Sequence, residues 1–225
     1  MMAQHIADPV AQLHALLPPA GGRTVVGLVG LPGAGKSTQA RRWTEQVNAL
    51  AQAPVMQCVG MDGFHYSRAE LAQLPAPQND LARRGAPWTF DATRLAISLQ
   101  ALRVRDYAGR HSEVHWPDFD HAVGEPVAGA ICIAASTRLV LVEGLYLLLP
   151  DAPWGLSPLL DHTWFLDEDL DTAMHRLVTR HRQSWGLSEA EARARIARND
   201  RLNAGIADQT RRYAQARVTP TPIHP

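Results

Sequence analysis

The sequence has few cysteines, few aromatic residues and no excess of charge of either sign. Its 225 residues include two cysteines, Cys58 and Cys132, and 22 Lys and Arg balance 22 Asp and Glu. The balanced charge argues against a nucleic-acid partner, because binding a phosphate backbone normally requires a basic excess. The cysteines lack the partners of a disulfide or zinc pattern, so we expect both to be reduced thiols in the core.

Long apolar runs are also missing. No stretch approaches the roughly 20 apolar residues that a membrane helix requires. The N-terminus does not show the basic region and apolar run of a signal peptide. We therefore expect a cytoplasmic protein without a membrane partner. The apolar fraction of 46% can still form a sizeable core, and the length fits one α/β domain with a small lid.

Apolar runs alternate with helical patterns along the chain, which favours a mostly parallel sheet flanked by helices on both faces. The expected strands are 24–30, 55–61, 138–149, 162–167 and 216–218. Helices are expected over 6–17, from the end of the segment 30–38 to about 51, from Leu170 onward, and after Ser67, Asp91 and Ser188, the last to about 204. We expect 78–88 to be a loop, 112–127 an irregular hairpin over the sheet edge, and 219–225 a flexible tail.

The segment GLPGAGKST follows the first expected strand directly. Its spacing matches G-x-x-x-x-G-K-[ST], the phosphate-binding loop, and it lies between a strand and a helix as that loop requires. Its backbone N–H groups and the helix N-terminus would cradle a polyphosphate, Lys36 would reach the β- and γ-phosphates, and Ser37 would bind Mg²⁺. The residues expected to bind ATP here are Gly30, Leu31, Pro32, Gly33, Ala34, Gly35, Lys36, Ser37 and Thr38.

Two carboxylates follow other apolar strands. Glu143 comes after Leu139–Val142, and Asp62 ends the strand at 55–61. The carboxyl ends of parallel strands face one crevice, so Glu143 could bind Mg²⁺ or a metal-bound water, and Asp62 could accept the proton of an attacking hydroxyl. An ordinary acid at a strand end, or a turn-capping role for Asp62, is the alternative for each.

Two arginines are candidates for charge stabilisation. Arg176 and Arg180 lie one turn apart on an expected helix, and Gly186 interrupts the pattern before the next helix. A helix–turn–helix in this place suits a lid whose arginines neutralise a transferring phosphoryl group. A solvated basic helix face is the alternative.

The motifs GLPGAGKST (30–38), MDGFH (61–65), RRGAPWTFD (83–91), PDFDH (117–121) and VEGLYLL (142–148) occur in this order. As a set they resemble the uridine kinase, phosphoribulokinase and bacterial pantothenate kinase superfamily. The similarity is strongest to its nucleoside/nucleotide kinase-like branch, also described as fructose-transport-system kinase-like. It covers about residues 22–218. The resemblance implies a P-loop NTPase fold, α/β, with a small helical lid, as a single domain over 1–225 whose core is 22–218 and whose lid and following helix are 170–204.

The resemblance also implies roles for individual residues. Asp62 would be the catalytic base, Glu143 and Ser37 would serve the metal, and Lys36, Arg176 and Arg180 would assist transfer. Asn199 and Asp200 would lie near the adenine. The residues that would contact the acceptor are His65, Arg83, Arg84, Asp91, His121 and Tyr146.

The expected function is ATP-dependent, Mg²⁺-assisted transfer of the γ-phosphoryl group to a hydroxyl of a sugar, a nucleoside or a pantothenate-like acid. Gly63-Phe64-His65-Tyr66 departs from the uridine kinase pattern, and the chain is shorter than pantothenate kinases, so neither substrate follows. A nucleotide-dependent regulatory protein is the alternative, although no guanine-reading Asn-Lys-x-Asp segment is present. A kinase-like fold without activity is a further alternative. A homodimer is compatible with the sequence.

Overall fold

A six-stranded parallel sheet forms the centre of the molecule, with the order β1-β8-β7-β2-β6-β3. The structure is a computed structural model that describes residues 3–120 and 122–221. The strands of this sheet are β1 (Gln4–Ile6), β2 (Thr24–Gly30), β3 (Met56–Gly60), β6 (Leu139–Gly144), β7 (His162–Leu166) and β8 (Ala216–Val218). β2 and β6 are buried almost throughout, as central parallel strands are.

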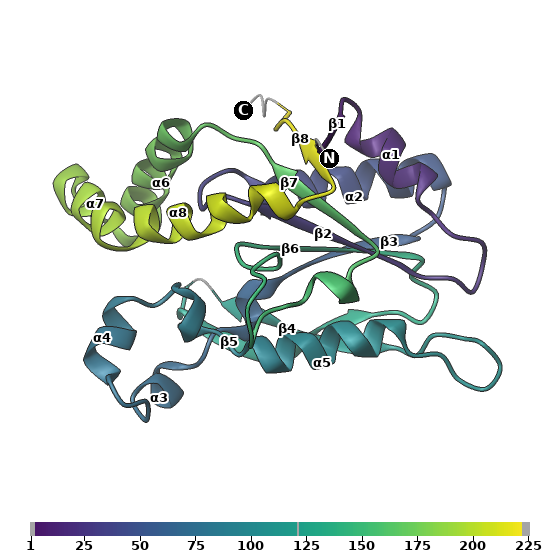
Figure 1. Cartoon of the computed structure of the whole chain (residues 1–225), viewed down its shortest axis with the longest axis horizontal. Helices are drawn as coiled ribbons and strands as arrows, with labels where there is room; N and C mark the ends of the chain where they lie inside the picture. The colour runs from purple at the N-terminus through teal and green to yellow at the C-terminus, as the bar shows by residue number, and fades with distance from the viewer. Residues whose placement is uncertain (1–2, 121, 222–225) are drawn as a thin grey trace.

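Helices cover both faces of the sheet. They are α1 (Pro9–Ala15), α2 (Lys36–Ala51), α3 (Arg68–Leu71), α4 (Pro77–Ala82), α5 (Ala92–Arg103), α6 (Leu170–Trp185), α7 (Glu189–Arg195) and α8 (Arg201–Gln209). Figure 1 shows α1, α2 and α8 on one side of the sheet, and α5 with the hairpin of β4 (Val114–Asp120) and β5 (Glu125–Ile133) on the other. The α/β fold expected from the sequence is therefore confirmed. No helix in the described ranges has the length and apolarity needed to cross a membrane.

The register of β6 against its two neighbours positions the site. Glu143 lies opposite Leu28 of β2 and opposite Gly60 of β3. Because all three strands run in the same direction, their carboxyl ends meet at one edge of the sheet. The loop after β2, the turn after β3 and the end of β6 therefore come together.

The hairpin β4–β5 is fixed to the end of β3. The Trp116 indole N–H donates to the Gly60 carbonyl at 2.8 Å, and the Trp116 ring packs edge-on against Phe64. A Cβ on Gly63 would lie 2.2 Å from the Pro117 carbonyl oxygen, so only glycine allows this approach. The expected irregular hairpin is present, with a shift of register between Trp116 and Asp118, but its second strand continues past the expected end at 127 to Ile133.

Several local predictions are wrong because long-range pairing decides the structure. Residues 4–6, partly assigned to the first helix, pair with β8, and the helix begins only after Asp8, whose carboxylate accepts from the N–H groups of Val10 and Ala11. Part of the expected loop at 78–88 is α4, which starts with Pro77 in the first helical turn, where proline is favoured.

Other corrections concern where elements end. The strand expected over 138–149 stops at Gly144, and the apolar residues after it are a buried or half-buried loop. The helix expected from Ser188 to about 204 is α7 and α8 joined by a π turn, Ile196–Asp200. Cys132 is exposed on β5, so it is not a core thiol, and Cys58 is only half-buried. In the expected flexible tail, the Thr221 carbonyl accepts a hydrogen bond from Gln39 at 2.6 Å, and 222–225 lie outside the described residues.

The close approach at Gly63 predicts a large loss of stability on substitution. We expect Gly63→Ala to lower the free energy of unfolding by about 1–3 kcal/mol or more, because the contact is with backbone and cannot be relieved by a side-chain rotation. Gly205→Ala on α8 is the control: its Cβ would meet nothing within 4 Å, so a gain of about 0.5–1 kcal/mol is expected. Urea unfolding measures both, and equal stability of Gly63→Ala and wild type would contradict the packing argument.

Candidate active site

The loop between β2 and α2 has the backbone geometry of a phosphate cradle. Gly35 has a φ of 89° and caps α2 without a side-chain hydrogen bond, so the N–H groups of the first helical turn remain directed out of the helix end. Gly33 has a φ of 81°, and a Cβ there would lie 2.2 Å from the Ala173 carbonyl of α6. Glycine is therefore required at Gly33 both for the turn and for the contact between the loop and α6.

Lys36 is a buried cation at this loop. Its Nζ donates to the Leu31 carbonyl at 3.0 Å, and the residue as a whole is 8% exposed. Burial lowers the pKa of Lys36, and the carboxylates of Glu143 and Asp62 oppose that shift. A desolvated ammonium beside outward-facing N–H groups is suited to a polyphosphate, because the charge of the ligand offsets the cost of burying the ammonium.

Glu143 meets the loop at its first helical turn. The Ser37 hydroxyl donates to Glu143 Oε1 at 2.7 Å. Burial raises the pKa of Glu143, and the Lys36 ammonium is the largest effect that lowers it. A hydroxyl and a carboxylate in contact fit Mg²⁺, which binds few protein oxygens and completes its shell with phosphate oxygens and water. The described residues contain no cluster of three or more His, Cys, Asp or Glu side chains that could hold a metal by themselves.

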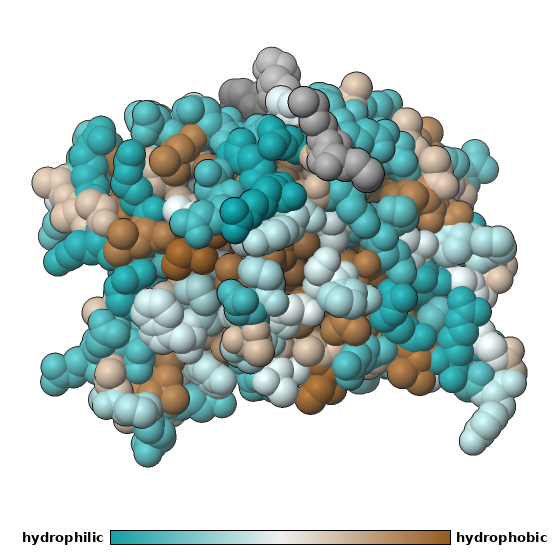
Figure 2. Space-filling model, in the orientation of Figure 1, coloured by the Kyte–Doolittle hydropathy of each residue, from teal (hydrophilic) through white to brown (hydrophobic). Residues whose placement is uncertain are grey.

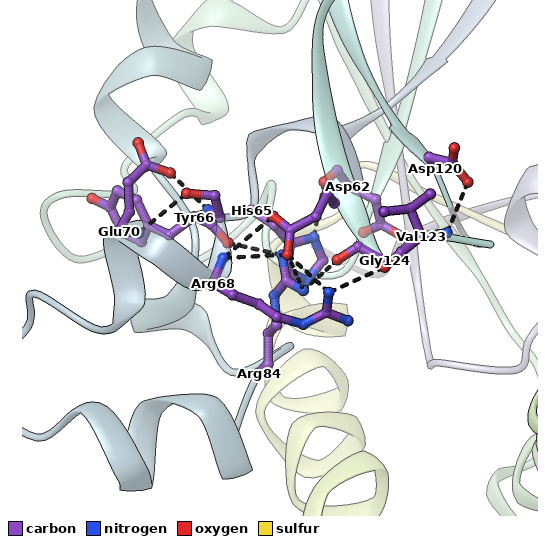
Figure 3. A network of polar contacts seen from close by, with 11 residues as sticks. Asp62, His65, Tyr66, Arg68, Glu70, Arg84, Asp120, Val123 and Gly124 are labelled. Atoms are coloured by element: carbon purple, nitrogen blue, oxygen red, sulfur yellow. Dashed lines mark hydrogen bonds and ion pairs between the residues drawn. The ribbon is translucent and has the colours of Figure 1, made fainter.

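Asp62 follows β3 in a short 3₁₀ turn, Met61–Phe64. Its backbone carbonyl accepts from the N–H of His65 at 3.1 Å and lies 2.8 Å from His65 Nδ1. Both the backbone and the ring of His65 therefore contact this carbonyl and fix the turn. The His65 ring packs between Phe90 and Phe119. Figure 3 shows Asp62 and His65 in the same polar network as Arg84.

Two cavities meet at the phosphate cradle. We call the one on the side of Asp62 and Glu143 the inner cavity, and the one on the side of Pro220 and Thr221 the outer cavity. The inner cavity, of about 520 Å³, is lined by Lys36, Ser37, Asp62 and Glu143 together with residues of the 83–91 loop and the helices α6 and α7. The outer cavity, of about 470 Å³, is lined by Gly33 to Gln39 and by Arg176, Pro220 and Thr221. Figure 2 shows the surface notched where α6 and α7 lie across from α3 and α4. The three strand-end groups expected to converge do lie around one cavity.

The two lid arginines have different positions. Arg180 lines both cavities, and it is close enough to Lys36 and Glu143 to influence the pKa of each. Arg176 lines only the outer cavity and forms an ion pair with Glu168. Arg180 therefore lies where the two cavities join, and Arg176 lies on the outer side.

The 83–91 loop is held by the helix that follows the lid. Arg83 donates to the side-chain oxygens of Asn199 and Asn203 at 3.1 and 3.2 Å. Asn199 Nδ2 returns a hydrogen bond to the Arg84 carbonyl at 2.8 Å. Both asparagines are buried, and Gly85, with a φ of 104°, leaves room for their amides.

Arg84 lines the inner cavity, but its guanidinium is occupied. It donates to the carbonyls of Gly124 and Tyr66 (Figure 3). It also lies 3.6 Å from Glu125. Burial lowers the pKa of Arg84, and Glu125 opposes that effect. Arg84 thus ties the 83–91 loop to the tip of the β4–β5 hairpin and forms part of the cavity wall.

Other residues expected at the acceptor lie outside the two cavities. Arg83 does not line either cavity. Asp91 caps α5 through a hydrogen bond from the Arg94 N–H at 2.8 Å. Tyr146 is fully buried, packs against Phe90 and Trp154, and donates to the Gly85 carbonyl at 2.7 Å. Burial raises the pKa of Tyr146 well above its usual range. These side chains support the loop, and their direct contact with an acceptor stays a prediction, as does that of His121, which lies outside the described residues.

Asn199 and Asp200 lie on the inner side of the site. Both line the inner cavity and neither lines the outer one. Asp200 Oδ2 lies 3.1 Å from His181 Nε2 on α6, and Asn199 holds the 83–91 loop. Their predicted contact with adenine stays untested, while their observed contacts join the loop to the lid helix.

Sequence reasoning missed several residues that line the inner cavity: Arg68, Leu81, Phe119, Val123, His181, Trp185, Arg195 and Asn203. Phe119 lies in the PDFDH segment near the hairpin tip, and the others lie on helices or at that tip, outside the motifs named above. The helical spacing of His181 and Trp185, four residues apart, was the one local signal that they share a face.

The fold and the cradle define the class: this is a P-loop protein of the α/β type. No family model matches the sequence. The chain is 40% identical over 194 residues to a proposed uridine kinase of Schizosaccharomyces pombe, covering 83% of this chain and 79% of that protein. It is 41% identical over 146 residues to an ATP-dependent kinase-like protein of Aspergillus versicolor, covering 64% and 84%.

A solved structure extends the comparison to almost the whole chain. A proposed fructose transport system kinase from a Silicibacter species superposes with a TM-score of 0.78 at 32% identity, covering 96% of this chain and 100% of that one. The chain belongs to the P-loop kinases of the uridine kinase and phosphoribulokinase type.

The contacts of Arg83 predict that Asn203 orders the 83–91 loop. Asn203→Ala removes one buried acceptor from a charged donor, so we expect a loss of about 1–3 kcal/mol in unfolding free energy and faster amide exchange in peptides covering 83–91. Arg198→Ala is the control, because Arg198 is exposed and donates only to a carbonyl of its own helix. Hydrogen exchange followed by mass spectrometry checks this, and unchanged exchange of the loop in Asn203→Ala would contradict it.

Proposed function

We propose that the protein is an ATP-dependent kinase that phosphorylates a hydroxyl group of a small metabolite. The observation that carries the proposal is the shared inner cavity, where the phosphate cradle, the Ser37–Glu143 pair and Asp62 face one space. A switch protein needs the cradle and a metal site, but it does not need an acid beside a separate, partly apolar pocket.

Each group has a role that its position supports. The cradle and Lys36 hold the triphosphate, which enters through the outer cavity. Ser37 and Glu143 would hold Mg²⁺, which supplies charge neutralisation on the phosphate oxygens. Arg180, where the cavities join, neutralises charge on the group in transfer, and Asp62 accepts the proton of the attacking hydroxyl.

The acceptor occupies the inner cavity, whose lining includes the apolar side chains of Phe90, Phe119, Val123 and Leu145 beside Gly85 and Gly124. Sugars, nucleosides and pantothenate-like acids are the classes to test, and the names of the relatives add uridine and fructose to that panel. ADP release measured with each compound, against ATP alone, identifies the acceptor, and ATP hydrolysis that no compound stimulates would favour a regulatory protein.

Substitution of Asp62 tests whether its carboxylate is the catalytic base. We expect Asp62→Asn to bind Mg·ATP like wild type and to lower kcat for the acceptor about 10²–10⁴-fold, because the amide cannot take the hydroxyl proton. The matched control is Asp118→Asn, at an exposed position that lines neither cavity. Wild-type turnover in Asp62→Asn would remove Asp62 from the mechanism.

Substitution of Glu143 tests whether its carboxylate binds Mg²⁺. Glu143→Gln keeps the size of the side chain and loses its charge, so the Mg²⁺ concentration for half-maximal nucleotide binding should rise about tenfold or more. Calorimetric titration of AMP-PNP at several Mg²⁺ concentrations measures this without turnover. Glu45→Gln, on the exposed face of α2, should behave as wild type. An unaltered Mg²⁺ requirement in Glu143→Gln would show that this carboxylate does not serve the metal.

A further inference from the structure

Two arginines of the lid helices reach the inner cavity without a counter-charge. Among the described residues, neither Arg180 nor Arg195 forms an ion pair, whereas the neighbouring arginines Arg176, Arg182 and Arg193 pair with glutamates. Arg180 also lines the outer cavity, so the proposed triphosphate would neutralise its charge. Arg195 lines only the inner cavity, and the proposed chemistry has not used it.

Arg195 is held by a flat stack. Its guanidinium carbon lies 4.5 Å from the centre of the Trp185 ring, and that ring stacks on His181 at 4.4 Å with an interplanar angle of 12°. His181 is buried and fixed by Asp200 at 3.1 Å. A cation–π contact orients a guanidinium without using its N–H donors. The terminal N–H groups of Arg195 therefore remain for another partner.

The other guanidiniums on this side are already engaged. Arg84 donates to two backbone carbonyls and approaches Glu125, and Arg68 pairs with Glu125 at 3.2 Å. Arg195 Nε and His181 Nδ1 are buried atoms without a hydrogen-bond partner, as is Arg84 Nε, but the terminal nitrogens of Arg84 are bonded and no bond is seen for those of Arg195 in the described residues. The stack would pack α6 against α7 equally well with an uncharged side chain. Arg195 is half-buried at the cavity wall, and an anionic ligand there would form charge-assisted hydrogen bonds with its terminal N–H groups.

We propose that Arg195 binds an anionic group of the acceptor, so that the substrate is a hydroxyl compound that also carries a carboxylate or a phosphate. This inference rests on the proposed kinase function and narrows its acceptor. The guanidinium fork suits either group, because both offer two oxygens to parallel N–H donors.

Matched pairs of compounds test the proposal: glycerol and D-glycerate for a carboxylate, fructose and fructose 6-phosphate, and ribulose and ribulose 5-phosphate for a phosphate. Binding is measured by calorimetry with saturating Mg·AMP-PNP, which keeps anions out of the phosphate cradle. We expect an anionic member to bind at least tenfold more tightly than its neutral partner. The carboxylate and phosphate arms show which group is read.

Variants of Arg195 assign the effect to that residue. Arg195→Met, which keeps an apolar contact with Trp185, should weaken binding of the anionic compound about 10- to 100-fold and leave AMP-PNP affinity unchanged. Arg195→Lys should recover part of the loss. Arg193→Met is the control, because Arg193 is exposed and paired with Glu189.

Two results would overturn the inference: anionic compounds that bind no better than their neutral partners, or Arg195→Met binding them like wild type. Efficient phosphorylation of a neutral acceptor would also reject it while leaving the kinase function in place. Binding of an anionic compound through Arg195 without any phosphoryl transfer would instead support the subsite and reject the kinase function.

Discussion

The contact between Ser37 and Glu143 is the interaction on which the rest of the site depends. It joins the first turn of α2 to the end of β6, and it exists only because β6 lies between β2 and β3 in one register. The same register places Gly60, and hence the turn that carries Asp62, beside Glu143. A shift of one residue in β6 would turn the carboxylate to the other face of the sheet, because side chains alternate along a strand.

The π turn Ile196–Asp200 contacts both the 83–91 loop and α6, which line another wall of the inner cavity. Two consecutive residues act in different directions: Asn199 binds the 83–91 loop, and Asp200 binds His181 on α6. A π turn changes the angular spacing of successive side chains locally, and such turns are frequent at functional sites. The 83–91 loop, which lines part of the inner cavity, and the helix that carries Arg180 are therefore tied to the same turn.

Much of the catalytic side was predictable from the sequence, and little of the acceptor side was. The cradle, Asp62 and Glu143 each follow an apolar strand, and parallel strands bring such ends together whatever the details of packing. Arg83, Asp91 and Tyr146 match family positions, yet none of them lines either cavity: Arg83 and Tyr146 bind partners around the 83–91 loop, and Asp91 caps α5. The direction of Arg83 depends on α4 and on the π turn, which have no strong local signal. Arg195 lay outside every motif because a stack on Trp185 is a tertiary feature.

The fold buries two oppositely charged side chains, Lys36 and Glu143, beside the phosphate cradle. Removing Lys36 and Glu143 from water is costly: burial lowers the pKa of Lys36 and raises the pKa of Glu143, and the attraction between the two side chains opposes both shifts. Well-packed apolar side chains of similar volume would serve stability as well or better, so these charges are not explained by the fold alone. The proposed ligand, a triphosphate with a divalent cation, would offset both costs, because its phosphate oxygens would face Lys36 and Arg180 and its cation would face Glu143.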